Sequence, residues 1–307
     1  MKTKRYGSFW LNLGILGIFM LAWCLVLPCF LPFGPGPAFS HETAPPDTTL
    51  SGSGTPDGFY HEYSVALSRY VSSLGLVAYR TLKEDRRGLD NFADTLAGLD
   101  RTQFNRWNER EKIAFWINAY NALTLRTIID HYPIKSRLLT SIRFPKNSIR
   151  QIAGVWDKLE HEVMGGQITL KSIEHEILRQ EFDEPRIHMA LNCASIGCPP
   201  LRAAPFTADY LDEQLNDQIQ QFLAKPENFS IDRKKNRVSL SSIFSWFGED
   251  FIDRYGTESF FTRFDNNERS VLNFISRYVS DENREYLRTG SYRIKYLKYD
   301  WGLNEQR

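Results

Sequence analysis

The sequence predicts an α+β fold: a helix-rich single domain around a small antiparallel or mixed sheet, preceded by one transmembrane helix. Helical patterns outnumber strand patterns, and the strand patterns occur as hairpins and isolated pieces rather than in alternation with helices. A doubly wound parallel fold is therefore disfavoured, and the chain has no Walker motif, glycine-rich dinucleotide fingerprint or internal repeat. The 307 residues, of which 42% are hydrophobic, are enough to bury a substantial core.

The amino terminus has the pattern of a membrane segment. Three basic residues lie within residues 1–8, and residues 9–33 are almost all apolar. As a helix, this apolar run would be about 37 Å long, enough to cross a bilayer of roughly 30 Å. We predict an uncleaved anchor. A cleaved secretory signal is the alternative, because residues 38–40 offer small side chains of the kind a signal peptidase needs.

The charges around this run predict that the rest of the chain is exported. No Lys or Arg occurs between the apolar run and Arg69. The amino terminus is therefore expected in the cytoplasm and the remainder outside it, in the periplasm if the source is bacterial. Residues 34–58 are rich in Pro, Gly, Ser and Thr and predict a flexible linker. The extracytoplasmic globular domain is then expected over residues 59–307.

The overall charge argues against a nucleic-acid partner. The chain has 38 Lys and Arg against 37 Asp and Glu, so its net charge is +1 and it has no global field to attract nucleic acid or anionic lipid. The basic run at residues 232–237 is interpreted as the polar turn of a hairpin. The partners we expect are the membrane, through the amino-terminal helix, and an unknown small molecule, peptide or protein. No cofactor is predicted.

The globular part begins with helices around an extended piece. Residues 59–73 repeat large apolar side chains near helical spacing, and Gly75 ends the pattern before an extended segment at 76–82. Residues 89–99 predict a second short helix. The strongest helical pattern covers residues 108–133, where apolar side chains occupy more than one face, so this helix is expected to be central and buried.

The middle of the chain mixes both kinds of pattern. Residues 154–170 predict a hairpin around a paired-glycine turn, and residues 170–182 predict a helix. Residues 186–193 form a short, mostly apolar run that fits a buried strand. Residues 208–225 predict a helix with its charges on one face.

The last third follows the same mixture. Residues 229–240 predict a hairpin with a polar turn, and residues 241–256 predict a helix with a serine cap. A further helix is expected at 269–287, and the chain ends on an extended segment at 292–301.

Five phrases in this part of the chain carry a family resemblance. They are AFWINAYNALTL (114–125), ITLKSIEHEILR (168–179), HMALNCASIGCPPLR (188–202), IFSWFGEDF (243–251) and YDWGLN (299–304). Together and in this order they resemble the family catalogued as domain of unknown function 547, over most of the chain from about Phe59 to Asn304. The resemblance implies an exported or membrane-attached bacterial protein, with similar domains in plants behind coiled-coil segments, and it implies no activity.

A more remote similarity exists to the papain and transglutaminase superfamily, in which a central helix packs on an antiparallel sheet that carries a histidine. Here the central helix offers Asn118 and Asn121 and no cysteine. The similarity therefore does not carry that superfamily's mechanism over to this chain.

The segment from His188 to Arg202 is the main candidate for chemistry. Gly197, Pro199 and Pro200 build a tight reversal that could bring the sulfurs of Cys193 and Cys198 together, so in an exported domain a disulfide is the simplest interpretation. If reduced, either thiol could act as a nucleophile. A metal site with His188 as third ligand is a further alternative, but the second pair of ligands is missing and no metal is predicted.

The base for such a thiol is not adjacent in sequence. In an extended strand His188 would share a face with Asn192 and point away from Cys193. A local His-Cys pair is therefore disfavoured, and His175 or His161 would have to supply the base.

Further polar residues lie on predicted helices. His175 and Arg179 share a helix face and form either a surface pair or part of a cleft beside the Cys193 loop. The amides of Asn118 and Asn121 need hydrogen-bond partners when buried, so they either clamp loop backbone or orient a ligand.

Two aromatic phrases offer a carbohydrate alternative. Trp246 and Asp250 lie near the end of an aromatic-rich helix, and Asp300 and Trp301 lie near the end of the chain. Paired carboxylates could act on a sugar, although such aromatic residues more often belong to the core.

Two functions follow from these features. The first is a thiol-dependent hydrolase or transferase with a Cys/His-centred site. The second is a non-catalytic binding or scaffold domain that a Cys193–Cys198 disulfide holds together. The catalytic candidates are Cys193, His188, His175 and Asn192. The binding candidates are Asn118, Asn121, Arg179, Trp246 and Asp250.

Overall fold

The computed structural model describes residues 55, 56 and 58–306. The expected cytoplasmic residues 1–8, the membrane segment 9–33 and nearly all of the linker 34–58 lie outside the described residues. Within the described part, no helix is both long enough and apolar enough to span a bilayer. The described residues form one compact unit. This unit is helix-rich with small sheets, which confirms the α+β prediction.

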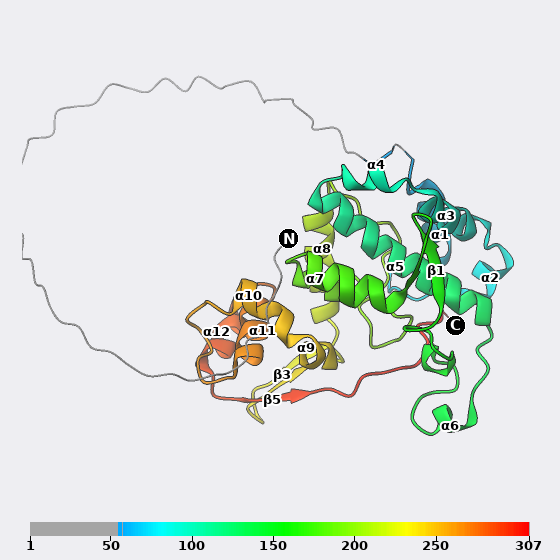
Figure 1. Cartoon of the computed structure of the whole chain (residues 1–307). Coiled ribbons are helices and arrows are strands. Elements are labelled where there is room, and N and C mark those ends of the chain that lie inside the picture. Colours follow the sequence, from blue (N-terminus) through cyan, green and yellow to red (C-terminus); the bar gives the residue numbers. More distant parts are fainter. Residues whose placement is uncertain (1–54, 57, 307) are drawn as a thin grey trace, which may run out of the picture. The chain divides into compact units, whose positions relative to one another are not determined.

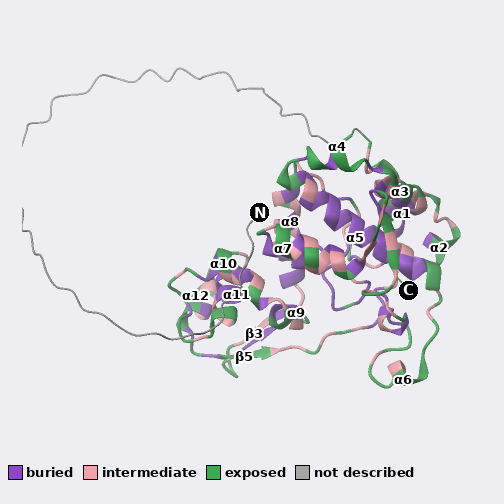
Figure 2. Ribbon diagram, in the orientation of Figure 1, coloured by how far each residue is buried: buried purple, intermediate pink, exposed green. Residues whose placement is uncertain are grey.

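The helix α5 (Glu109–His131) is the centre of the first hydrophobic core (Figure 1). It begins at a capping box, in which Glu111 N donates to Asn108 Oδ1 at 3.0 Å and Asn108 N donates to Glu111 Oε2 at 2.7 Å. Every residue from Ile113 to Leu125 is buried, so α5 leaves no face to solvent over this length (Figure 2). Apolar side chains on several faces predict this position.

Shorter elements surround α5. They are α1 (His61–Tyr70), α2 (Tyr79–Glu84), α3 (Arg87–Gly98), α4 (Arg101–Asn105), α6 (Leu138–Ser141), η1 (Ile149–Gln151), and the antiparallel hairpin of β1 (Glu160–Val163) and β2 (Gly166–Thr169). The hairpin is confirmed. Its turn lies at Met164 and Gly165, which both have positive φ. The extended segment expected at 76–82 is wrong except at Val77, which bridges Val71 and Glu305, because the chain already enters α2 at Tyr79.

The helix expected at 170–182 exists in an altered form. It is a π-helix, η2 (Ser172–Leu178), that continues into α7 (Arg179–Glu181). The buried strand expected at 186–193 is wrong. This stretch begins as a 3-10 helix, η3 (Pro185–Met189), because Pro185 starts the helical turn and the Glu184 carboxylate accepts a hydrogen bond from Arg186 N at 3.2 Å.

A second core lies beneath a mixed sheet and several short helices. Its elements are α8 (Leu211–Leu223), β3 (Phe229–Asp232), β4 (Arg237–Leu240), α9 (Ser242–Trp246), η4 (Gly248–Phe251), α10 (Ile252–Tyr255), α11 (Asn266–Ser276), α12 (Asp281–Thr289) and β5 (Arg293–Tyr296). Strand β4 is central, antiparallel to β3 and parallel to β5. The helices expected at 241–256 and 269–287 are each divided into shorter pieces.

The carboxyl-terminal segment returns from β5 to the first core (Figure 1). Val77 N donates to Asn304 O at 2.9 Å, and Gln306 N donates to Val77 O at 2.8 Å. Asn304 N also donates to Ala194 O at 3.2 Å. This segment therefore joins the amino-terminal helices, the cysteine loop and the second core.

Candidate functional site

A pocket of about 190 Å³ opens beside the cysteine loop. Both cysteines contribute to its wall, which supplies the concavity that an active or binding site requires. Aromatic side chains form much of the rest, including Trp156, Trp246 and Trp301. Trp246 is 47% exposed and stacks on Trp301 with ring centroids 6.0 Å apart.

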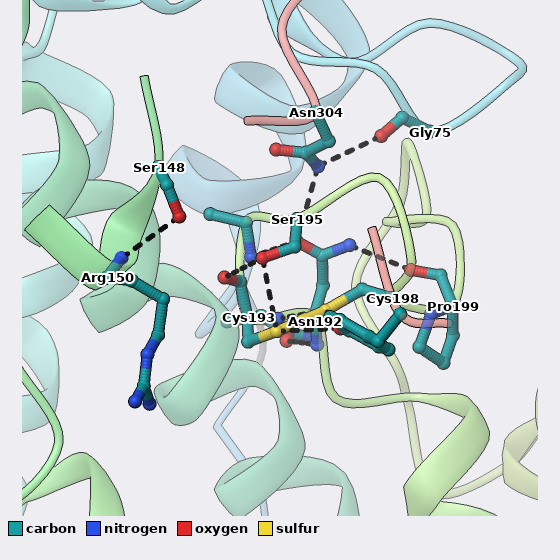
Figure 3. The surroundings of a disulfide bond; sticks show 12 residues. Gly75, Ser148, Arg150, Asn192, Cys193, Ser195, Cys198, Pro199 and Asn304 are labelled. Carbon is teal, nitrogen blue, oxygen red and sulfur yellow. Dashed lines mark hydrogen bonds between the residues drawn. A yellow bond between two sulfur atoms is a disulfide. The ribbon is translucent and has the colours of Figure 1, made fainter. Parts of the chain in front are cut away.

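A disulfide joins Cys193 and Cys198, whose Cα atoms are 6.2 Å apart (Figure 3). Cys193 N lies 2.9 Å from Cys198 Sγ. Tyr299 Oη lies 3.1 Å from Cys193 Sγ and 3.0 Å from Cys198 Sγ, and it must donate because disulfide sulfurs carry no proton. Cys193 is partly exposed, whereas Cys198 is buried. The pocket therefore presents Cys193 as the more accessible sulfur.

The side chain of Asn192 holds the backbone of this loop through hydrogen bonds. Its Nδ2 donates to Pro199 O at 2.7 Å, and its Oδ1 accepts from Ala194 N at 2.9 Å and from Asn304 Nδ2 at 3.3 Å (Figure 3). Ala194 has a φ of 57°, so the loop includes a left-handed residue other than glycine. Asn192 is buried and committed to backbone and to Asn304, and it does not line the pocket.

The two asparagines of α5 also hold loops. Asn118 donates to Phe206 O at 2.7 Å and accepts from Phe206 N at 2.9 Å. Asn121 donates to Ala190 O at 3.0 Å and accepts from Asn192 N at 2.8 Å. Both amides thus clamp backbone, which is the first of the two alternatives for them, and Asn121 fixes the start of the cysteine loop.

A charged network lies behind one wall of the pocket. Arg179 donates to Asp250 through Nε at 2.6 Å and Nη2 at 3.0 Å, and His188 Nε2 lies 2.7 Å from Asp250 Oδ2. Burial alone raises the pKa of Asp250, but the hydrogen bonds from His188 and Arg179 outweigh it and hold the pKa at about 2. Asp250 is therefore an anion at neutral pH and holds the other two side chains in place.

His188 is turned toward this network. Because residues 186–193 are not a strand, the predicted alternation of side chains does not apply here. The ring of His188 stacks on Phe247 with centroids 4.1 Å apart, and its Nε2 is committed to Asp250. Burial lowers the pKa of His188. A neutral His188 that donates Nε2–H to Asp250 is not placed to deprotonate Cys193.

His175 is held by the same arginine. Arg179 Nη1 lies 2.8 Å from His175 Nδ1, and a guanidinium can only donate. Burial lowers the pKa of His175, and the charge of Arg179 lowers it further, so the ring is neutral at pH 7. The proton of the neutral ring is then on Nε2, which makes that nitrogen a donor at the pocket wall.

Glu174 is a pocket residue whose pKa is shifted toward neutrality. Burial raises its pKa to about 7, with Asp250 adding to the effect, while a hydrogen bond from Tyr120 and the charge of Arg179 oppose it. Tyr120 in turn accepts a hydrogen bond from Trp156. The three side chains form a connected path, Trp156 to Tyr120 to Glu174, that ends on a carboxyl able to take or give a proton near neutrality.

Arg150 supplies the positive charge of the pocket. Its guanidinium carbon lies 4.5 Å from the ring centroid of Phe144, 5.2 Å from that of Trp156 and 5.1 Å from that of Trp301. None of the described carboxylates forms an ion pair with it. Burial lowers its pKa, and with no partner its charge is available to an incoming anion.

Other candidates lie away from this pocket. His161, on β1, lines a different hollow with Arg126 and Asp130, so it is not near the cysteine loop. Asp300 Oδ1 accepts from Gly302 N at 2.8 Å and stabilises a local turn. Across the described part of the chain, no cluster of three or more His, Cys, Asp or Glu side chains is arranged to hold a metal ion.

The sequence pointed to only part of this pocket. Of the candidate residues, those that line the pocket are Cys193, Cys198, His175, His188 and Trp246. Arg179 and Asp250 contact the lining residues His175 and His188 from behind. Arg150, Trp156, Tyr120 and Tyr299 were not predicted. One feature of the sequence could have pointed to Arg150. The 26 residues from His131 to Trp156 contain no Asp or Glu, so Arg150 has no acidic neighbour in sequence to pair with.

The comparisons with known proteins agree with the motifs. No curated protein and no solved structure matches the chain. The family model described as Protein of unknown function, DUF547, matches residues 104–223. This range includes α5, Arg150, Glu174 and both cysteines, whereas Trp246, Asp250 and Tyr299 lie beyond it. The chain therefore contains a domain of the DUF547 family.

Proposed function

We propose that this domain is a hydrolase or transferase that binds a small anionic ligand in the pocket, with Glu174 as its general acid and base. The observation that carries the proposal is the half-buried Glu174 carboxyl, with a pKa of about 7, on the wall of an aromatic pocket. A group with a pKa near the working pH is the most effective proton donor and acceptor. At many catalytic sites the pKa of a carboxyl group inside a binding pocket is raised in this way.

The size and lining of the pocket support a small ligand. Its volume of about 190 Å³ is below the roughly 300–1,000 Å³ of pockets that enclose drug-sized molecules. It therefore fits a small molecule or one end group of a larger one. The indole rings favour a flat or apolar portion, and Arg150 favours a carboxylate or phosphate.

The neighbouring groups have supporting roles in this proposal. Tyr120 donates to Glu174 and holds the carboxyl in position, and Asp250 keeps Arg179 beside it. His175 offers its Nε2–H to an oxygen of the ligand. The disulfide fixes the opposite wall, so the acid-base reaction needs no free thiol.

A thiol-dependent reaction is the second candidate. It is favoured by the unequal exposure of the two cysteines, because Cys193 is partly exposed whereas Cys198 is buried, although both line the pocket. An attacking and a resolving cysteine differ in this way. The reaction would require prior reduction of the disulfide. It would have to proceed without a general base hydrogen-bonded to Cys193 Sγ, since the side-chain hydrogen-bond contacts of that atom are the hydroxyls of Tyr299 and Ser195.

The proposed setting is a membrane-anchored domain outside the cytoplasm. Residues 9–33 have the composition of an anchor, and a disulfide is stable in an oxidising compartment.

The test is a panel of chromogenic esters and thioesters, with and without a carboxylate on the acyl group, assayed on the non-reduced protein. We expect turnover of a carboxylate-bearing member. Glu174→Gln should lower kcat by roughly 10²–10⁴-fold, as expected for loss of a general acid-base group. Glu176→Gln is the matched control, because Glu176 is exposed in the same π-helix. Arg150→Gln should raise KM more than it lowers kcat.

Each outcome selects one candidate. Full turnover by Glu174→Gln excludes the acid-base role. Turnover that appears only after reduction and is lost in Cys193→Ser establishes the thiol reaction. Quenching of tryptophan fluorescence by the carboxylate compounds, weakened by Arg150→Gln and without turnover, identifies a non-catalytic binding domain.

A further inference from the structure

An exposed loop next to the pocket is rich in basic and aliphatic residues, and most of these side chains do not line the pocket. Residues 135–146, here called the basic loop, connect α5 to η1 and include the single helical turn of α6. Figure 1 shows this loop extending away from the end of α5, and Figure 2 shows most of it as exposed. Its tip presents Leu138, Leu139 and Ile142 at exposures of 86%, 80% and 80%. Three large aliphatic side chains therefore share one exposed helical turn.

The charges around this tip have a single sign. Lys135, Arg137, Arg143 and Lys146 are all exposed. No Asp or Glu occurs from His131 to Trp156, and none of these four cations forms an ion pair with any other described residue. A solvated surface loop ordinarily mixes both signs, whereas apolar side chains inside a ring of cations are the pattern of a membrane-surface segment.

The protein holds this tip in place. The buried side chain of Gln151 accepts from Arg137 N at 2.9 Å through Oε1. Its Nε2 donates to Pro145 O at 3.0 Å and lies 3.4 Å from Phe144 O. One buried amide thus closes both ends of the loop, so the aliphatic side chains are directed outward by a fixed framework.

Room for a headgroup lies beside the tip. A hollow of about 420 Å³ separates the basic loop from the body of the domain. It is lined by Arg137, Arg143 and Arg150, with Asp157 as the one acidic residue of its wall. Guanidinium groups around such a hollow match the phosphate of a lipid headgroup.

We propose that the basic loop docks on an anionic lipid bilayer, with Leu138, Leu139 and Ile142 in the interfacial layer and with Arg137 and Arg143 on lipid phosphates. Two copies of the loop would repel each other, because every charge on them is positive. This surface belongs to the folded domain and is independent of the membrane segment expected at residues 9–33. It would place the mouth of the pocket near the bilayer, since Phe144 of the loop contacts both Arg150 and Trp301.

The test is hydrogen-deuterium exchange on the full chain. The chain is reconstituted with vesicles of phosphatidylcholine alone and with vesicles that also contain phosphatidylglycerol. We expect amides of residues 135–147 to exchange at least about tenfold more slowly with the anionic vesicles, and the protection to fall at high salt. Because the measurement is local, insertion of the amino terminus does not produce the signal.

Two variants and two matched controls complete the test. Leu138→Ser with Leu139→Ser and Ile142→Ser, and separately Arg137→Gln with Arg143→Gln, should each abolish the protection. All five positions are exposed, and unchanged exchange without vesicles shows that the loop is still folded. Leu74→Ser removes an exposed leucine elsewhere, and Lys234→Gln with Lys235→Gln removes two exposed lysines of the β3–β4 turn. Both controls should retain the protection.

Three results would overturn the proposal. They are equal exchange in both kinds of vesicle, protection that survives both variants, and protection that appears without lipid as protein concentration rises. The last would identify a second copy as the occupant. None of these results bears on the enzymatic turnover that depends on Glu174, so either proposal can fail without the other.

Discussion

Glu174 and Asp250 show how one arginine supports two carboxyl groups in opposite states. Arg179 contacts Asp250 through two hydrogen bonds, and with His188 it holds the pKa of Asp250 at about 2. Glu174 receives only the longer-range charge of Arg179 and one hydrogen bond from Tyr120, so burial dominates and its pKa rises to about 7. One carboxylate is therefore a fixed anion, and the other is able to exchange a proton.

This assignment predicts a specific effect of pH on stability. Glu174 keeps its proton up to about pH 7 when folded but loses it near 4.5 when unfolded, so its contribution is fully present below 4.5 and is lost as pH rises to 7. Glu174→Gln should equal the wild type in free energy of unfolding at pH 4 and exceed it by as much as about 3 kcal/mol at pH 8. Urea unfolding at both pH values measures the difference.

The control for this prediction is Glu176→Gln, whose side chain is exposed on the same π-helix. It should change the free energy of unfolding by less than about 0.5 kcal/mol at either pH. If Glu174→Gln and the wild type keep a constant difference from pH 4 to pH 8, the raised pKa is refuted and the acid-base role loses its support.

Residue chemistry was predictable where one short segment contains the partners. Cys193 and Cys198 are five positions apart, and Gly197 and Pro199 on either side of Cys198 favour a turn, so their pairing could be proposed from the sequence. The environment of Glu174 could not be predicted, because Tyr120 lies more than fifty positions away on α5. Nothing in the sequence indicates that the Tyr120 hydroxyl and the Glu174 carboxyl lie close together. Long-range contacts of this kind depend on how the elements pack.

Elements were predictable in proportion to the length of their pattern. The helix at 108–133 and the hairpins at 154–170 and 229–240 are confirmed, because a long periodic run or a tight turn specifies them locally. The strand at 186–193 was wrong, since an apolar run of eight residues fits a buried strand or a buried 3-10 turn equally well. There the tertiary contacts of Asn121 with Ala190 and Asn192 decide the backbone path.

The link between α5 and the cysteine loop predicts the effect of a single substitution. Asn121→Ala leaves Ala190 O and Asn192 N buried without their amide partner, and each such group costs about 1–3 kcal/mol. We expect a loss of roughly 2–4 kcal/mol in the free energy of unfolding, together with faster hydrogen exchange in residues 190–199. Chemical unfolding and exchange by mass spectrometry measure the two effects.

Thr124 supplies the matched control on the same helix. It is buried, and its hydroxyl has no hydrogen-bond partner among the described residues. Thr124→Val should therefore be neutral or slightly stabilising and should leave the loop unchanged. Equal destabilisation by both substitutions would show that the helix, and not the asparagine clamp, determines the order of the loop.

At the scale of the whole molecule, the two cores are joined by the carboxyl-terminal segment. Residues 299–306 follow β5 of the second core and bind residues of the first, as in the pair of hydrogen bonds between Val77 and residues 304 and 306. On the way they pair with the cysteine loop through Ile196 N to Gly302 O at 2.8 Å and Gly197 N to Asp300 O at 2.9 Å. The pocket therefore exists only when both cores are assembled.

The sequence predicted an extended segment at residues 292–301, of which β5 covers Arg293–Tyr296, but it did not predict that the residues after β5 connect the two cores. A strand pattern shows which residues alternate, and it does not show the partner, since Val77 lies more than two hundred positions away. The class of fold followed from the mixture of helices and hairpins, whereas the mixed sheet order β3-β4-β5, with its parallel β4–β5 pair, depends on α9 to α12 lying between the two strands.

Truncation after Lys298 tests this role of the segment. It removes the buried residues Leu303 and Asn304, several backbone hydrogen bonds and the Tyr299 and Trp301 walls of the pocket. At about 1 kcal/mol for each hydrogen bond and 1.5–3 kcal/mol for the leucine, the loss exceeds roughly 5 kcal/mol. That is comparable to the total stability of many domains, so we expect no cooperative unfolding transition and rapid proteolysis.

A shorter truncation serves as the control and tests whether the last residues of the chain also contribute to stability. A chain that ends at Glu305 keeps Asn304, whose side chain accepts from Tyr79 Oη at 2.6 Å and donates to Gly75 O at 3.3 Å. Of the hydrogen bonds among the described residues, it loses the one from Gln306 N to Val77 O. It should remain folded with a loss of about 1 kcal/mol. Should the chain that ends at Lys298 still unfold cooperatively at near the wild-type urea midpoint, the two cores would be stable independently. The pocket would then lie between separable parts, and ligand binding in the two truncated chains would differ without any difference in stability.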